Sequence, residues 1–180
     1  MPRPPVIELT GFPVPVYALR RYRPQRRGPQ DEFSKNIIAL KYDSEEAIKY
    51  FANMIMGRLR TKGIPCKPDL IATVPGEGRG LPSVGKRIAP LLKCKFRADV
   101  LVPAEIAGIT RRPYDKPTFE ERRKSMRLKA RIRDKSILLL DDVITSHATM
   151  QAALKCILDG HPSLAVAVAL GYSGDQQSFA

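Results

Sequence analysis

The sequence predicts an α/β protein with a doubly wound, mainly parallel sheet. Short apolar runs alternate along the chain with longer segments of helical periodicity, as in parallel sheets joined by right-handed crossovers. The clearest run, Ile137 to Leu140, is apolar at every position, as expected for a strand buried on both faces. With 180 residues, 43% of them apolar, the chain fits a single domain with a substantial core.

The chain begins with a basic, proline-rich segment. Residues 1–30 hold seven prolines and six arginines against one acid. Residues 14–17 are compatible with the start of an edge strand, where proline is tolerated, and residues 20–29 with an exposed loop. We therefore separate residues 1–36 from a single α/β domain over residues 37–180.

The first half of this domain is predicted as follows. Residues 37–42 indicate a strand or strand end, and residues 44–60 an amphipathic helix with Asp43 and Glu46 as its capping box and Lys62-Gly63 as its stop. Residues 69–74 indicate a strand. A helix is expected from near Pro82, kinked or ended by Pro90.

The second half continues the alternation. A third strand is expected over residues 98–102, followed by a long flexible loop, residues 103–134, in which residues 118–126 form a short helix. The apolar strand 137–140, a helix over residues 148–159 that ends at Gly160, and a last strand over residues 164–170 complete the pattern.

Several classes of protein are disfavoured by composition. No apolar run approaches the ~20 residues of a membrane span, and the first residues lack a secretory signal. The three cysteines (Cys66, Cys94 and Cys156) are odd in number and lack Cys-x-x-Cys spacing, which disfavours a disulfide framework and a zinc site. We expect a cytoplasmic protein.

Positive charge is unevenly distributed. The net charge is +13, and residues 111–135 hold eleven Lys or Arg against four acids, whereas residues 137–180 are net acidic. Such a stretch forms a solvated basic face, a surface for nucleic acid, or an electrostatic funnel for a multiply charged small molecule.

The strand 137–140 leads into the most informative segment. Two carboxylates, Asp141 and Asp142, follow it, and ligands of open α/β sheets bind at the carboxyl ends of strands. Next come Val143, Ile144, Thr145, Ser146, His147, Ala148 and Thr149. A hydroxyl-rich turn at a helix N-terminus suits a phosphate. The acids and turn together suit a phosphorylated sugar, although an acidic pair can also simply cap the next helix.

The run Leu138 to Thr149 resembles the ribose-5-phosphate loop of type I phosphoribosyltransferases. The resemblance implies a phosphoribosyltransferase-like, Rossmann-like core, with Asp141 and Asp142 holding the ribose hydroxyls of phosphoribosyl pyrophosphate and Val143 to Thr149 holding its 5-phosphate. His147 stands where the family has glycine. It allows close backbone approach poorly, and either donates to the phosphate itself or marks a site that binds weakly or lacks catalysis.

The resemblance implies further parts of the site. Pro75, Gly76, Glu77, Gly78 and Arg79 correspond to the loop that binds pyrophosphate. Residues 103–134 correspond to a mobile catalytic loop, whose cations are Arg111, Arg112, Arg122, Arg123 and Lys124. Mg²⁺ would be the cofactor, held indirectly near Asp141 and Asp142. Residues 1–36 would form part of a small hood over the site, and the protein would be a homodimer.

Other segments are similar to the ComF/GntX-like branch of that family. They are Ala39-Leu40-Lys41-Tyr42, Asp69 to Pro75 and Glu121-Arg122-Arg123-Lys124-Ser125. The N-terminal zinc-binding cysteine cluster of that branch and its Arg-Gly-Phe-Asn segment are absent.

Three functions follow as hypotheses. The first is a Mg-dependent phosphoribosyltransferase with an unknown acceptor. The second is a non-catalytic, ComF-like protein that binds phosphoribosyl pyrophosphate or handles nucleic acid. The third is a P-loop NTPase, since Gly80 to Arg87 nearly spells that motif, but Arg87 replaces the required Ser or Thr and Pro82 removes a loop amide.

Overall fold

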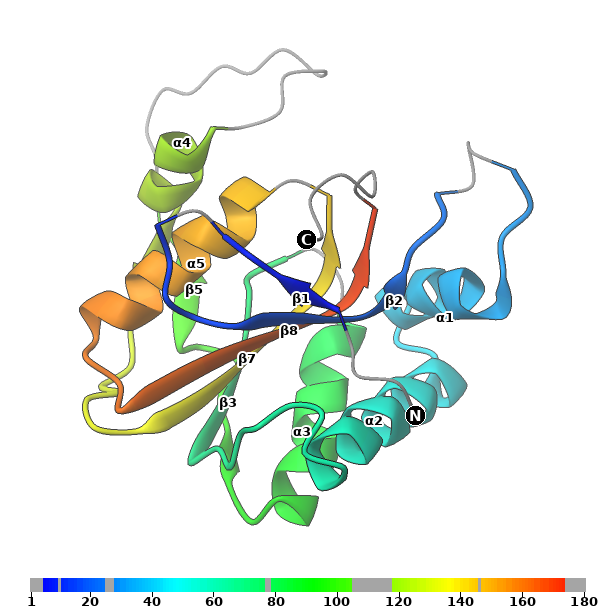
Figure 1. Ribbon diagram of the computed structural model, residues 1–180, viewed down its shortest axis with the longest axis horizontal. Coiled ribbons are helices and arrows are strands. Elements are labelled where there is room, and N and C mark those ends of the chain that lie inside the picture. The colour runs from blue at the N-terminus through cyan, green and yellow to red at the C-terminus, as the bar shows by residue number, and fades with distance from the viewer. Residues whose placement is uncertain are drawn as a thin grey trace.

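The described part of the chain forms a six-stranded central sheet that is parallel except at one edge. The computed structural model describes residues 5–9, 11–24, 28–76, 79–104, 118–145 and 147–173. In spatial order, the strands are β1 (Val6–Ile7), β2 (Val16–Arg21), β8 (Leu164–Tyr172), β7 (Ser136–Ile144), β3 (Leu70–Thr73) and β4 (Lys95–Phe96). Of these strands, β1 alone runs antiparallel to its neighbour. The predicted α/β fold with a mainly parallel sheet is confirmed (Figure 1).

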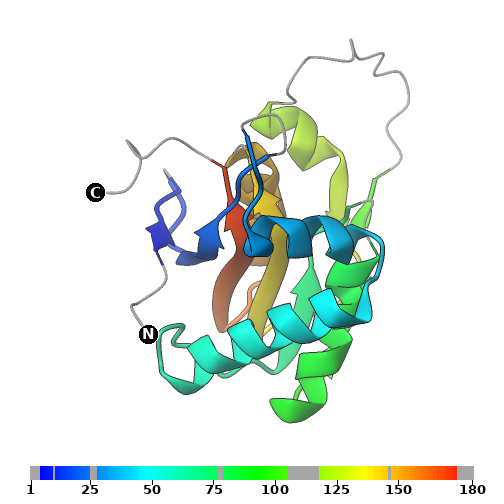
Figure 2. The same cartoon turned by 90° about the vertical axis from the view of Figure 1, so that its right-hand side faces the viewer.

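Helices cover both faces of this sheet. The helices on one face are α1 (Glu32–Lys41), α2 (Glu45–Arg60) and α3 (Gly80–Leu91), and those on the other are α4 (Phe119–Lys124) and α5 (His147–Asp159) (Figures 1 and 2). Strand β7 separates the two layers. Ile137 and Leu139 join the apolar core beneath α5, whereas Leu138 and Leu140 join the core beneath α1, α2 and α3. The sheet is therefore doubly wound, as predicted.

A second, smaller sheet lies outside the first. It pairs β5 (Leu101–Pro103) with β6 (Met126–Leu128) in antiparallel register. Of the strand expected over residues 98–102, only residues 101 and 102 form a strand, as part of β5, and β5 does not join the central sheet, whose edge is β4. Residues 105–117 of the expected long loop lie outside the described residues; its later part contains α4 and β6.

The prediction of a strand over residues 37–42 is wrong, because this segment is the second half of α1. Asp31 caps the helix, accepting a hydrogen bond from the backbone N–H of Ser34 at 2.8 Å. Phe33, Ile37 and Leu40 recur at helical spacing, and each is at most 2% exposed. The β-branched run that suggested a strand therefore belongs to the buried stripe of a helix.

The helix expected over residues 44–60 is confirmed as α2, but its cap is one residue later than predicted. The Ser44 hydroxyl accepts from the backbone N–H of Ala47 and donates to the Glu46 carboxylate. Asp43 instead adopts a left-handed backbone, with φ of 61°. The capping box assigned to Asp43 and Glu46 is thus a contact between Ser44 and Glu46.

The N-terminal segment contributes to the main sheet. β2 was expected at an edge, but it lies between β1 and β8, and it pairs with β8 in parallel. Pro15 precedes the strand, and its carbonyl oxygen accepts from the N–H of Ala167. Residue 36, the expected boundary, lies inside α1.

None of the helices in the described ranges is both long and apolar enough to cross a bilayer.

Candidate functional site

Asp141 and Asp142 lie within β7, not after it. The strand was predicted to end at Leu140, yet it continues to Ile144 because β8 continues beside it. Val143 pairs with Gly171, and Ile144 pairs with Tyr172. The two acids are therefore held by a parallel ladder near the carboxyl end of the sheet, where ligands of such folds bind.

The two carboxylates lie on opposite sides of the sheet, as their charged neighbours show. Asp141 lies on the side of α4, where the charge of Arg122 acts on it, and is only 8% exposed. Asp142 lies on the side of α1, near Lys41, and its side chain is 40% exposed. Asp142 is therefore the more accessible of the two acids.

Asp141 has a strongly altered acidity. Its pKa is raised to about 7, mainly by burial and also by the neighbouring negative charge of Asp142, whereas the backbone N–H of Asp142, which donates to it at 2.9 Å, acts in the opposite direction. The positive charge of Arg122 in α4 also lowers this pKa. Arg122 Nε is itself buried and has no hydrogen-bond partner among the described residues.

Asp142 has a different partner. Its Oδ1 accepts from the backbone N–H of Val143 at 2.6 Å, and its Oδ2 lies 4.0 Å from Nζ of Lys41, the last residue of α1. Lys41 was not among the residues expected at the site, because its segment was interpreted as a strand. The signal that would have indicated it is a lysine in the last turn of a capped helix.

The expected phosphate-binding residues span the end of β7 and the start of α5. Val143 and Ile144 are strand residues, Thr145 is exposed, and Ser146 lies outside the described residues. His147 is exposed and begins α5, followed by the half-buried Ala148 and Thr149. The first turn of α5 contains no acid that would compete with an anion for its free N–H groups.

The loop expected to bind pyrophosphate starts beside the acids. Thr73 pairs with Leu140, and the N–H of Val74 donates to the carbonyl oxygen of Leu140 at 2.9 Å. Pro75 and Gly76 follow, Glu77 and Gly78 lie outside the described residues, and Arg79 is exposed at the start of α3. The structure therefore brings the described parts of both predicted loops to one end of the sheet.

Three of the cations expected on a flexible loop lie on a helix. Arg111 and Arg112 lie outside the described residues. Arg122, Arg123 and Lys124 belong to α4, which Thr118 and Glu121 cap reciprocally. Arg123 forms an ion pair with Asp159 of α5 at 3.1 Å, and Phe119 packs edge-to-face on Phe12. These contacts hold α4 against the body of the protein.

The two acids fit a magnesium ion that takes most of its ligands from the bound substrate and from water. No cluster of three or more His, Cys, Asp or Glu side chains that could hold a metal occurs in the described residues. Mg²⁺ commonly uses one or two carboxylates and takes its other ligands from phosphate oxygens and water. The half-exposed carboxylate of Asp142 fits that role better than the buried one of Asp141.

Comparison with protein-family models and with curated proteins finds no match. Among solved structures, the chain is similar to adenine phosphoribosyltransferase from Leishmania tarentolae, with 19% identity over 85% of this chain and 82% of that one and a TM-score of 0.48. A purine phosphoribosyltransferase from Pyrococcus horikoshii Ot3 matches with 16% identity over 86% and 79%, at a TM-score of 0.43.

An allosteric regulatory enzyme of purine biosynthesis also matches, with 14% identity and a TM-score of 0.43. The match covers 63% of this chain and 24% of that one, so the chain spans about a quarter of that enzyme's length.

Proposed function

We propose that the protein is a Mg-dependent phosphoribosyltransferase that uses phosphoribosyl pyrophosphate, with an acceptor still to be identified. One observation carries the proposal: the half-exposed carboxylate of Asp142, the start of α5 and the start of the loop at Pro75 meet at the carboxyl end of β3 and β7. Hydroxyl, phosphate and diphosphate groups of one ligand would each find a matching partner there.

In this proposal, Asp142 accepts hydrogen bonds from the ribose hydroxyls, and the N–H groups of residues 147–149 donate to the 5-phosphate. The loop from Pro75 to Arg79 holds the diphosphate. The acceptor forms a bond to C1 of the ribose while the bond from C1 to the diphosphate oxygen breaks, and the diphosphate leaves with the electron pair. The protein positions these groups and stabilises charge, so no side chain becomes a covalent nucleophile.

Mg²⁺, when bound, would neutralise charge on the diphosphate. Asp142 would hold it, either directly or through water. Asp141 would act from the interior by setting the charge around Asp142.

The test is a pyrophosphate-release assay with a panel of purine, pyrimidine and simple amine acceptors. We expect release with at least one acceptor, and its loss in the Asp141→Asn/Asp142→Asn double variant. Asp99→Asn is the matched control, since Asp99 is an exposed acid paired with Arg97 and Lys129. Calorimetry with phosphoribosyl pyrophosphate and Mg²⁺ separates binding from turnover. Unchanged binding in the double variant would refute the site.

A second candidate function, binding of nucleic acid without catalysis, is favoured by the residues that follow α4. Arg127, Lys129 and Arg131 are exposed and alternate with the half-buried Leu128 and the buried Ala130 and Ile132. Residues 127–132 pack closely against Gly160, which follows α5. A Cβ at residue 160 would lie within 3 Å of the side chains of Leu128 and Ile132, so only glycine fits there without a shift. The alternation thus presents a row of cations on one face.

This second candidate predicts that a fluorescent single-stranded oligonucleotide binds at low salt and dissociates as salt rises. Arg127→Ala/Arg131→Ala should weaken binding and flatten its salt dependence. Lys35→Ala/Lys67→Ala removes the same charge from exposed positions elsewhere and should have a smaller effect. Absence of binding at low salt would eliminate this candidate.

A further inference from the structure

Lys41 lies at the site but belongs to neither of the two predicted loops, residues 75–79 and 143–149. It ends α1, and its Nζ lies 4.0 Å from Asp142 Oδ2. The side chain is 55% exposed, so it is free to exchange this partner for another. As an ion pair alone, so exposed a contact contributes little to stability.

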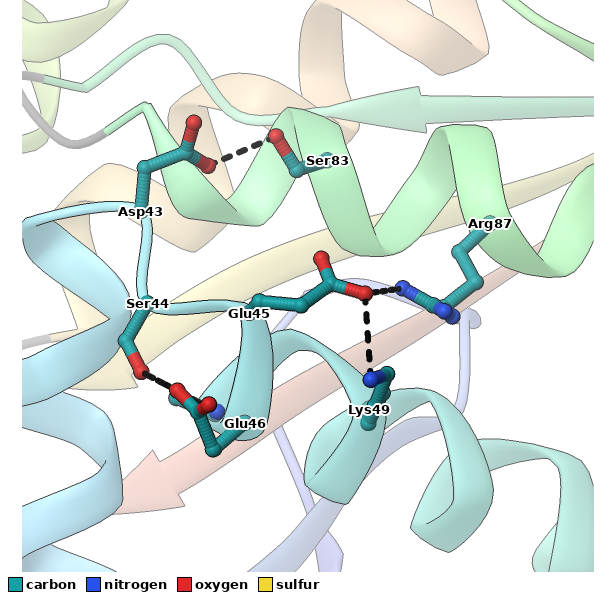
Figure 3. A network of polar contacts seen from close by, with 8 residues as sticks. Asp43, Ser44, Glu45, Glu46, Lys49, Ser83 and Arg87 are labelled. Atoms are coloured by element: carbon teal, nitrogen blue, oxygen red, sulfur yellow. Dashed lines mark hydrogen bonds and ion pairs between the residues drawn. The ribbon is translucent and has the colours of Figure 1, made fainter.

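The backbone on both sides of Lys41 is held against α3. On one side, the carbonyl oxygen of Leu40 lies so close to Gly80 that a Cβ there would overlap it. On the other side, the carboxylate of Asp43 accepts a hydrogen bond from the Ser83 hydroxyl at 2.7 Å (Figure 3). The turn that carries Lys41 is therefore fixed relative to the first residues of α3.

A further contact extends this attachment into α2. Glu45 forms an ion pair with Arg87 of α3 at 2.6 Å and a second one with Lys49 at 3.6 Å (Figure 3). Because Arg79 is the N-cap residue of α3, the position of Lys41 is tied to Arg79 as well as to Asp142.

From this placement we infer that Lys41 binds the diphosphate of the ligand, an inference that rests on the proposed function. A lysine ammonium is a compact charge on a flexible stem and serves as a donor to phosphate oxygens. Without ligand, Lys41 balances the charge of Asp142. With ligand, Asp142 binds the sugar hydroxyls or magnesium, and Lys41 binds the phosphate oxygens that lie between Asp142 and Arg79.

Three ligands distinguish this role from a purely structural one. Calorimetry would use phosphoribosyl pyrophosphate, inorganic pyrophosphate and ribose 5-phosphate, each with Mg²⁺. In Lys41→Ala we expect the affinity for the two diphosphates to fall by about tenfold or more, and that for ribose 5-phosphate to change by less than about twofold. Lys41→Arg should restore most of the diphosphate affinity.

Lys35→Ala is the matched control, since Lys35 is an exposed lysine on the same helix. It should bind all three ligands as the wild type does, and both alanine variants should unfold at the wild-type denaturant midpoint. If Lys41→Ala binds phosphoribosyl pyrophosphate like the wild type, or loses ribose 5-phosphate equally, the inference is overturned and the proposed function stands. If the wild type binds none of the three ligands, the proposed function fails, and the inference fails with it.

Discussion

At the scale of single residues, two neighbouring aspartates have opposite environments. Asp141 is enclosed beside α4 and α5, and Asp142 reaches solvent beside Lys41. Burial makes ionisation of Asp141 costly, which is why its pKa is raised to about 7. The free energy of unfolding must therefore depend on pH through this group.

We predict that Asp141→Asn stabilises the protein at pH 8. The folded-state pKa of Asp141 is raised, so its contribution to stability is complete below pH 4 and is lost as pH rises through about 7. Asparagine mimics the protonated form and avoids this loss. The gain should be at most about 4 kcal/mol at pH 8 and near zero at pH 4. Urea unfolding at both pH values, with EDTA present, measures it.

Asp99→Asn is the control for this pH dependence. Its hydrogen bond and ion pair with Arg97, together with the charge of Lys129, lower the pKa of Asp99, so this substitution should not stabilise the protein at pH 8. If Asp141→Asn destabilised the protein at pH 8, the prediction would be contradicted, and the fold would need Asp141 in its ionised form.

A second prediction at this scale concerns two helical glycines. Gly80→Ala should destabilise the protein by about 1–3 kcal/mol, because its Cβ would overlap the carbonyl oxygen of Leu40. Gly57→Ala should instead stabilise it by about 0.5–1 kcal/mol, since nothing lies within 4 Å of the added carbon in α2. Thermal unfolding of both variants measures the contrast. Equal effects of the two substitutions would show that α1 and α3 are not tightly packed.

At the scale of elements, α1 determines where Lys41 lies. The helix depends on its first turn, where Asp31 accepts from the N–H of Ser34. The hydrogen bond with the Ser34 side chain, together with this one from the Ser34 backbone, holds the pKa of the Asp31 carboxyl below its usual range. The cap therefore contributes stability above the ordinary carboxyl pKa and loses it as pH falls through the lowered value.

We predict that Asp31→Ala lowers the free energy of unfolding by about 1 kcal/mol at pH 7. The difference from the wild type should shrink below pH 4, as the wild-type carboxyl becomes protonated. Asp31→Asn keeps a cap oxygen without the charge and should stay close to the wild type at neutral pH. Guanidinium unfolding across this range would contradict the prediction if the alanine variant matched the wild type at pH 7.

Long, periodic elements could be predicted from the sequence, whereas short or ambiguous ones could not. The helix over residues 44–60 and the strand in 137–140 carry clear patterns, and both form. β4 has two residues, too few for any period. Ile37 and Ile38 are β-branched, and such residues occur both in strands and in the buried stripes of helices, so the sequence does not reveal that Lys41 ends a helix.

The extent of β7 could not be predicted either. Its last residues are held in the strand by Gly171 and Tyr172 of β8, and no local pattern reveals such a partner. The sequence therefore predicts the two acids directly after the strand, both at the ligand. Their place within a strand, on opposite faces, follows only from the tertiary pairing. Loop residues 75 and 76 could be placed from the sequence because the end of β3 was clear.

At the scale of the whole molecule, two apolar layers share one sheet. Leu139 and Leu140 are adjacent and fully buried, but each belongs to a different layer. A cavity on either side should therefore weaken the same strand. This arrangement favours cooperative unfolding of the entire domain.

We predict that Leu139→Ala and Leu140→Ala each cost about 2–5 kcal/mol. Unfolding of each variant should remain a single transition, coincident by far-UV circular dichroism and by tyrosine fluorescence, for which the chain has six Tyr and no Trp. Leu91→Ala, at a position 59% exposed, should cost much less. Separate transitions for the two probes would mean that the two layers unfold independently.

The shortness of β1 and β4 limits how molecules of this protein can associate. In the ranges that the structure describes, each outer strand of the central sheet has two residues, so neither offers a long row of free backbone groups to which a strand of another molecule could pair. A continuous intermolecular sheet is therefore disfavoured. If two copies pair, as expected for a homodimer, they should meet through side-chain surfaces, and the outer strands β1 and β4 should stay outside the interface.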